Sequence, residues 1–200
     1  MKKVAAVLTV VLAGVGLAAI SQAQIQGSFH DFSNMGTAGG QLCIPCHTPH
    51  KADITTTDAP LWNHALTTAQ YTLYNSPTFD GKASQSQPGG VSKLCLSCHD
   101  GTVAVDSFAG TVGQTMIAAR ANVAAEGKLN KTHPISFSYT TALSNTDGEL
   151  ADPATLPKGW VNDGKFECSS CHDVHNKQGL SKMLNKANAG SALCLTCHTK

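Results

Sequence analysis

Eight cysteines form four copies of the segment Cys-x-x-Cys-His, and no cysteine lies outside these copies. Two thiols three residues apart, followed directly by an imidazole, can attach a c-type haem through two thioether bonds and ligate its iron. Positions i, i+3 and i+4 share one face of a helical turn, so the three side chains can reach the same haem. We therefore predict four covalently attached haem c groups. The attaching cysteines are Cys43, Cys46, Cys95, Cys98, Cys168, Cys171, Cys194 and Cys197, and the proximal iron ligands are His47, His99, His172 and His198.

Two other uses of eight cysteines compete with haem attachment. An exported chain could form four disulfides, and paired Cys-x-x-Cys units could hold zinc. Neither use requires a histidine after every second cysteine, although histidine makes up only 9 of the 200 residues. The regular histidine therefore favours haem.

Five further histidines could supply the second axial ligand of the irons. Methionine, another axial ligand of haem, occurs at only three positions after Met1. We expect bis-histidine ligation of all four irons with one histidine left over, which implies low reduction potentials. The candidate distal ligands are His30, His50, His64, His133 and His175.

The positions of these five histidines suggest different roles. His50 and His175 each lie three residues after a proximal histidine. Each is expected to bind the iron of a neighbouring haem, because its own haem occupies the proximal side. His133 precedes a proline that stiffens the backbone presenting it, and His30 lies on an N-terminal arm rich in Gly and Ser. His64 is the expected spare, although it could equally be a true ligand if His30 or His50 is donated to another subunit.

The number of histidines also bears on activity. Haem enzymes that act on nitrite, peroxide or oxygen need an iron with an open or weakly held sixth position. Since the histidines suffice to close all four irons, we expect an electron-transfer protein rather than an enzyme. The alternative is a small haem oxidoreductase with one open iron.

The first 23 residues have the layout of a secretory signal peptide. A basic start over residues 1–3 precedes an apolar run over residues 4–20, and Ser21-Gln22-Ala23 offers the small residues of a cleavage site. A membrane anchor is the alternative, but the polar flank and the lack of a second apolar run favour cleavage. We expect an exported protein with no stable membrane insertion after cleavage, located outside the cell or, alternatively, in the periplasm. Without Lys2 and Lys3, the 14 basic residues fall to 12 against 13 acidic ones, so charge gives no case for nucleic acid.

Outside the motifs the chain is poor in groups that build a conventional core. It has only six Phe, three Tyr and two Trp, and is rich in loop-forming residues. We expect a mostly irregular fold with a few short α-helices, little or no β-sheet, and the stacked haems as the core. An alanine-rich helix is expected over 114–126, ended by Gly127. Helical turns are expected over 90–99, 165–172 and 191–198, and ordered loops over 51–89 and 133–165.

The four motifs fall into two related pairs. Cys-x-x-Cys-His-x-x-His at 43–50 is repeated at 168–175, and Leu-Cys-Leu-x-Cys-His at 94–99 is repeated at 193–198. This internal repeat predicts two di-haem modules, 24–110 and 131–200, joined by a connecting segment at 111–130.

The order of these segments resembles a known family. His30-Asp31-Phe32-Ser33, Pro60-Leu61-Trp62-Asn63-His64 and Thr132-His133-Pro134, together with 43–50, 94–101 and 168–176, resemble the tetrahaem c-type cytochromes with doubled CxxCH motifs. The resemblance is closest to the OmcE type of extracellular cytochrome filament. It implies a chain of stacked bis-histidine haems, with one distal histidine coming from the adjacent subunit in filament-forming relatives. The expected partners are copies of this chain or other multihaem cytochromes; a monomeric periplasmic electron shuttle is the alternative.

Overall fold

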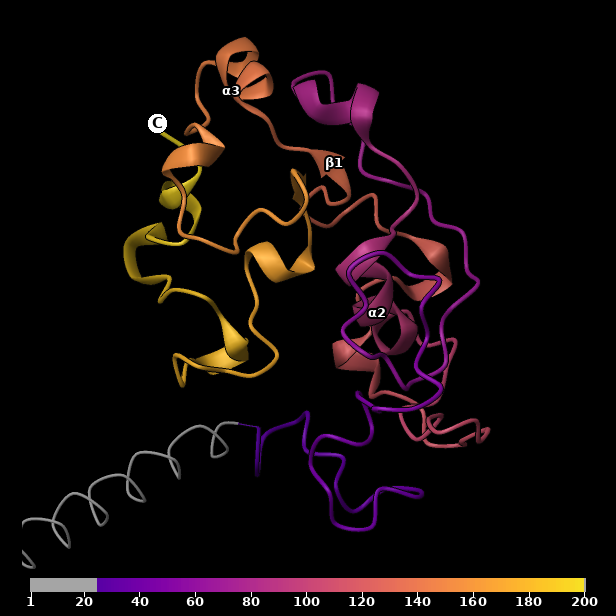
Figure 1. The fold of residues 1–200 in the computed structure, drawn as a ribbon. Coiled ribbons are helices and arrows are strands. Elements are labelled where there is room, and N and C mark those ends of the chain that lie inside the picture. Colours follow the sequence, from indigo (N-terminus) through magenta and orange to yellow (C-terminus); the bar gives the residue numbers. More distant parts are fainter. Residues whose placement is uncertain (1–24, 200) are drawn as a thin grey trace, which may run out of the picture.

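The computed structural model describes residues 25–199 as a chain with little regular secondary structure (Figure 1). The predicted signal segment, residues 1–23, lies outside the described residues. Two α-helices occur in the described part, α2 (Gly90–His99) and α3 (Thr141–Asp147). Strands β1 (Phe137–Ser138) and β2 (Lys165–Phe166) form one antiparallel pair, with Phe137 opposite Phe166. The predicted fold class, mostly irregular with little β-sheet, is confirmed.

Single 3-10 turns supply most of the remaining regular structure. A short segment can form such a turn, because its hydrogen bonds join residues only three positions apart and no long helical sequence is needed. They lie at Asp80–Ser84, Ala119–Ala121, Ala125–Gly127, Pro153–Thr155, Cys168–Ser170, Ser181–Met183, Ala189–Ser191 and Cys194–Thr196.

Helix α2 forms over the range that was predicted for it. Its side chains Leu94 and Leu96 are buried, so the helix has an apolar face to pack. The helix ends at His99, and two residues later the Gly101 amide donates to the Cys98 carbonyl over 3.0 Å. Gly101 has a φ of 74°, in the left-handed region that favours glycine and commonly ends helices.

The prediction of a continuous helix over 114–126 is wrong. Residues 111–118 are irregular, and only the two 3-10 turns at Ala119–Ala121 and Ala125–Gly127 follow. The backbone of this segment has long-range partners instead: the Val123 amide donates to the His99 carbonyl over 2.8 Å, and the Ala121 carbonyl accepts from the His99 ring. Glu126 has a φ of 58°, which no α-helix contains. Tertiary bonds to the second motif therefore override the helix propensity of alanine.

Three other local expectations need correction. The turn predicted over 165–172 begins as strand β2 and becomes helical only at Cys168–Ser170, and the turn predicted over 191–198 divides into two 3-10 turns. The stretch 133–165, predicted as loop, contains β1 and α3. Helix α3 begins after Thr140, whose hydroxyl accepts from the Leu143 amide over 3.2 Å, and it ends at Gly148 with a φ of 74°.

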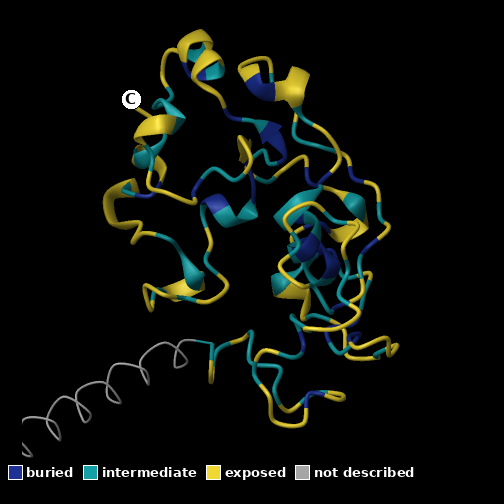
Figure 2. Ribbon diagram, in the orientation of Figure 1, coloured by how far each residue is buried: buried dark blue, intermediate teal, exposed yellow. Residues whose placement is uncertain are grey.

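Two small hydrophobic clusters take the place of a single core. The first joins Tyr71, Leu96, Ala124 and Leu129 beside α2. The second surrounds β1 and β2, where the Phe137 and Phe166 rings stack with centroids 5.5 Å apart. Figure 2 shows the buried residues concentrated at α2 and β1, with much of the remaining ribbon partly or fully exposed. Among residues 25–199, none of the helices has the length and apolar character needed to span a bilayer.

Candidate haem-binding sites

Each of the four motifs is wound into one helical turn, whatever element surrounds it. In three copies the histidine amide donates to the carbonyl of the first cysteine, and the remaining copy lies within α2. The distances are 2.8 Å for His47, 3.1 Å for His172 and 2.9 Å for His198, while His99 closes the last turn of α2. This turn places both thiols and the imidazole on one face, as attachment to a single haem requires.

Three proximal imidazoles are held by a backbone carbonyl in the same way. The Nδ1 of His47 lies 2.6 Å from the Pro60 oxygen, and that of His99 lies 2.8 Å from the Ala121 oxygen. The third is His172, whose Nδ1 lies 2.9 Å from the Lys182 carbonyl oxygen. A carbonyl can only accept, so Nδ1 carries the proton and Nε2 keeps its lone pair for a metal. The donor chemistry of these residues therefore fits an axial ligand of haem iron.

Three further imidazoles lie opposite proximal ones at one recurring separation. A metal-bound imidazole nitrogen lies about 2 Å from the metal, so two axial rings on opposite sides have centroids about 6 Å apart. The observed centroid separations are 5.9 Å for His30 and His99, 6.2 Å for His47 and His175, and 6.3 Å for His133 and His198. The structure thus brings three predicted distal histidines to three predicted proximal ones, at a spacing that fits one iron between each pair.

Burial keeps two of these distal candidates neutral, the form that binds a metal. Burial lowers the pKa of His30 to about 4, and the nearby imidazoles of His99 and His172 lower it further. Burial also lowers the pKa of His133, although its bond to the Pro134 carbonyl acts in the opposite direction. His30 therefore lies near imidazoles of both the second and the third motif.

Two predicted distal candidates, His50 and His64, are not paired in this way. His64 is buried, and both of its ring nitrogens lie on backbone carbonyls, at 2.8 Å from Ala65 and 3.0 Å from Ala104. A neutral imidazole can donate to only one of these carbonyls; among residues 25–199 no histidine ring faces His64 at the paired spacing, which leaves it as the candidate spare. His50 is exposed. Within residues 25–199, neither His50 nor His172 has a histidine ring facing it at the paired spacing.

The eight cysteines are free thiols, and cysteines of consecutive motifs approach one another. Burial and the nearby thiol of Cys46 in the first motif raise the pKa of Cys98 in the second, and burial and the thiol of Cys197 in the fourth raise the pKa of Cys171 in the third. Between the second and third motifs, the thiols of Cys95 and Cys168 are within hydrogen-bonding reach. The attachment segments are therefore neighbours in space in the order of the chain.

A buried carboxylate that the sequence analysis missed supports the second motif. Asp100 follows His99 directly, and its Oδ2 accepts from the Tyr71 and Thr67 hydroxyls, both over 2.6 Å. Its Oδ1 accepts from the Thr102 amide and hydroxyl, both over 2.7 Å. The long-range partners of this aspartate had no signal in the sequence. These bonds fix the end of α2 and thereby the position of the His99 backbone.

The comparisons with known proteins bear on the last motif pair. Residues 159–200 match the family model described as "Doubled CXXCH motif". Searches with the whole chain found no matching curated protein and no matching solved structure. The doubled motif, the free thiols and the paired imidazoles together support a multihaem c-type cytochrome that binds haem c covalently and works in electron transfer.

Proposed function

We propose that this chain is a secreted tetrahaem electron carrier that passes electrons along closely spaced bis-histidine haems, and that its copies assemble into an extracellular filament. The observation that carries the proposal is the set of three imidazole pairs, each at the spacing of two axial ligands. The contacts between cysteines of consecutive motifs support it, because they favour close approach of neighbouring haems.

The proposal assigns each haem its protein groups. When bound, haem would supply an iron that accepts and releases one electron, and two imidazoles of the chain would hold that iron. Each cysteine pair would fix the ring by two thioethers, and the carbonyl-bonded proximal imidazole would hold its orientation. The assigned axial pairs are His47 with His175, His99 with His30, and His198 with His133.

One of these pairs joins the two predicted modules. His175 follows the third motif, yet it lies opposite His47 of the first motif, with the two rings inclined by only 9°. The other two pairs each lie within one module. A ligand that crosses between modules would hold the two di-haem units at one fixed separation, which a continuous electron path needs.

The remaining histidines support assembly. His172 has a proximal-type bond but no facing imidazole among residues 25–199, while His50 is an exposed imidazole without such a pair. In a filament, His50 of one copy would complete the site of His172 in the next. A heterologous contact of this kind repeats without closing and produces an open filament.

The lack of a facing imidazole at His172 among residues 25–199 also favours a second candidate function. If no copy donates an imidazole, the iron at His172 would have an open sixth position, as haem enzymes require. The spin state of the iron separates the two functions, because an iron with two imidazoles is low-spin and an open one is high-spin.

Removing the candidate donor provides the test. We expect secreted wild-type protein to form filaments in negative-stain microscopy, with a fully low-spin ferric spectrum. His50→Ala should keep all four haems covalently attached but give only globular particles with a high-spin component. The neighbouring exposed side chain offers a matched control, Lys51→Gln, which should still polymerise.

The contrary outcomes are equally specific. Globular wild-type particles that are low-spin throughout would favour the periplasmic shuttle and exclude the filament. A high-spin component in assembled wild-type protein would support the enzyme. Filaments of His50→Ala would show that another residue closes the site.

A further inference from the structure

A second buried carboxyl group lies at the junction of the second and third motifs. Glu167 is only 4% exposed. Its Oε2 accepts from the Ser92 hydroxyl of α2 and from the Ser136 hydroxyl over 3.2 Å. The Ser92 hydroxyl also accepts from the Cys168 amide over 3.0 Å. The carboxyl group thus connects the helix of the second motif to the start of the third.

This position sets Glu167 beside the attachment points of two haems. It directly precedes Cys168 in the chain, and its charge acts on the thiol of Cys95. Those two thiols are within hydrogen-bonding reach of each other. A charge on Glu167 would therefore act on both neighbouring haems from a buried position, where electrostatic interactions are less screened than in bulk water.

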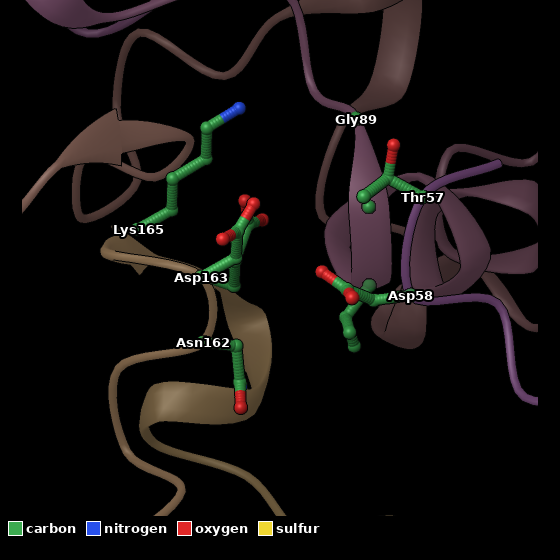
Figure 3. A pocket seen from close by; sticks show the side chains of 9 residues that line it. Thr57, Asp58, Gly89, Asn162, Asp163 and Lys165 are labelled. Atoms are coloured by element: carbon green, nitrogen blue, oxygen red, sulfur yellow. The ribbon is translucent and has the colours of Figure 1, made fainter.

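A solvent-connected pocket leads to this buried group. It has a volume of about 170 Å³, and Glu167 forms part of its lining. Figure 3 shows Asp58 on one wall and Asp163 and Lys165 on the other. All three of these side chains belong to exposed residues. A proton could therefore move between bulk water and Glu167 through a space bordered by two carboxylates.

The surroundings of Glu167 raise its pKa above the usual value of a glutamate. Burial raises its pKa, while bonds from Ser92 and Ser136 and the charge of Lys165 lower it less strongly. The other groups facing it are the carboxylates of Asp58 and Asp163 and the two thiols, which would be uncharged as thioethers. The carboxyl group is thus poised to respond to a new negative charge nearby.

We propose that Glu167 binds one proton from water when an electron arrives beside Cys95 and Cys168, and releases it when the electron leaves. This inference rests on the proposed electron-carrier function. In charge balance, an external donor is oxidised by one electron, the iron is reduced, and the carboxylate becomes a carboxylic acid. The added positive and negative charges cancel locally, so the pocket serves as the proton path of the electron conduit.

The sign of the linkage gives a measurable consequence. An added electron disfavours the carboxylate, so the pKa of Glu167 is higher in the reduced than in the oxidised protein. Reciprocally, the midpoint potential of this haem pair falls as pH rises between those two pKa values and is constant outside them. We expect the added electron to raise the proton affinity of Glu167 about tenfold or more. A tenfold change corresponds to a fall of about 59 mV in the midpoint potential across the pH-dependent step, for one electron.

The test compares two conservative variants of the holoprotein. Glu167→Gln keeps the shape and a hydrogen-bond acceptor but cannot ionise; Glu126→Gln is the control at an exposed glutamate that pairs with Lys128. Potentiometric titrations at several pH values should show the pH-dependent step in wild type and Glu126→Gln only. Reduced-minus-oxidised infrared spectra should show a carboxylic-acid band that disappears in Glu167→Gln. Ser92→Ala, which removes one bond to the carboxylate, should move the step to higher pH.

The outcomes separate this inference from the function on which it rests. A protein without reversible redox behaviour would overturn the electron-carrier proposal itself. A redox-active protein whose step and infrared band persist in Glu167→Gln would overturn only the role of Glu167. If all haems remain attached in Glu167→Gln, a change in the step cannot be attributed to misfolding.

Discussion

Two of the motifs are almost identical in sequence and very different in setting. Leu-Cys-Leu-Ser-Cys-His at 94–99 and Leu-Cys-Leu-Thr-Cys-His at 193–198 differ at one position after the shared leucine. The first lies in the ten-residue helix α2. The second contains only the 3-10 turn Cys194–Thr196. The same residues can therefore be held by local structure in one region and by distant contacts in the other.

Burial shows the contrast at equivalent positions. Leu96 is 1% exposed and belongs to the cluster beside α2, whereas Leu195, at the same place in its motif, is 51% exposed. His99 is fixed through a carbonyl and the Asp100 network. At His198 the chain is instead held by backbone bonds to the segment after α3: the Thr199 amide donates to the Glu149 carbonyl over 2.8 Å, and the Ala151 amide donates to the Cys197 carbonyl over 2.8 Å. The lesson is that one helical turn suffices for the attachment geometry, and that rigidity comes from what packs on it.

Replacing the attachment cysteines should produce the largest difference between the second motif and the last. In the variant Cys95→Ala/Cys98→Ala, we expect loss of more than one haem, because cysteines of the second motif lie near those of both the first and the third, and its helix α2 packs in the hydrophobic cluster. In Cys194→Ala/Cys197→Ala, we expect loss of the last haem alone. Mass spectrometry of the intact protein counts the haems. Equal losses in the two variants would contradict the contrast between the regions.

Truncating the two equivalent leucines should produce the next largest difference. Leu96→Ala leaves a cavity among Tyr71, Ala124 and Leu129 and should lower the free energy of unfolding by about 2–5 kcal/mol. Leu195→Ala removes a half-exposed side chain and should cost less than about 0.5 kcal/mol. Denaturant titration of the holoproteins measures both. A comparable loss in Leu195→Ala would mean that a surface on the last motif is covered by another copy.

The hydroxyl groups of the two motifs offer a smaller difference. The Ser97 Oγ accepts from the Thr67 amide over 3.0 Å and is fully buried, so Ser97→Ala leaves a buried amide without its acceptor. We expect a loss of about 1–3 kcal/mol. Thr196 instead bonds the Ala192 carbonyl and the exposed Lys186, and Thr196→Ala should cost less than about 0.5 kcal/mol. The thermal unfolding midpoints of the two variants, compared at one pH, measure this difference. A larger decrease in Thr196→Ala than in Ser97→Ala would contradict it.

Local signals predicted the fold better than they predicted its connections. The range of α2 could be predicted because it ends in a Cys-x-x-Cys-His motif, whose side chains share one face of a helical turn. Helix α3 was missed although Thr140 and Gly148 are ordinary capping residues, because the polar residues around them suggested a loop. The helix over 114–126 was predicted from alanine alone, and no local pattern reveals that Ala121 and Val123 bond to His99. Likewise, the sequence identifies candidate histidines but not which distal one faces which proximal one, since that depends on chain segments far apart.

Weakening the cap of α3 should produce the smallest difference between the two motifs, and it tests whether the last motif depends on distant contacts. Thr140→Ala removes the hydroxyl that accepts from the Leu143 amide and should destabilise the helix by about 1 kcal/mol. Because Glu149 and Ala151 follow this helix and bond to the last motif, the amides of Ala151 and Thr199 should exchange faster with solvent deuterium. Exchange at Gly101, which closes α2, should not change. Faster exchange at Gly101 as well would show that the two motifs are stabilised as one unit, so that their different settings do not make them independent.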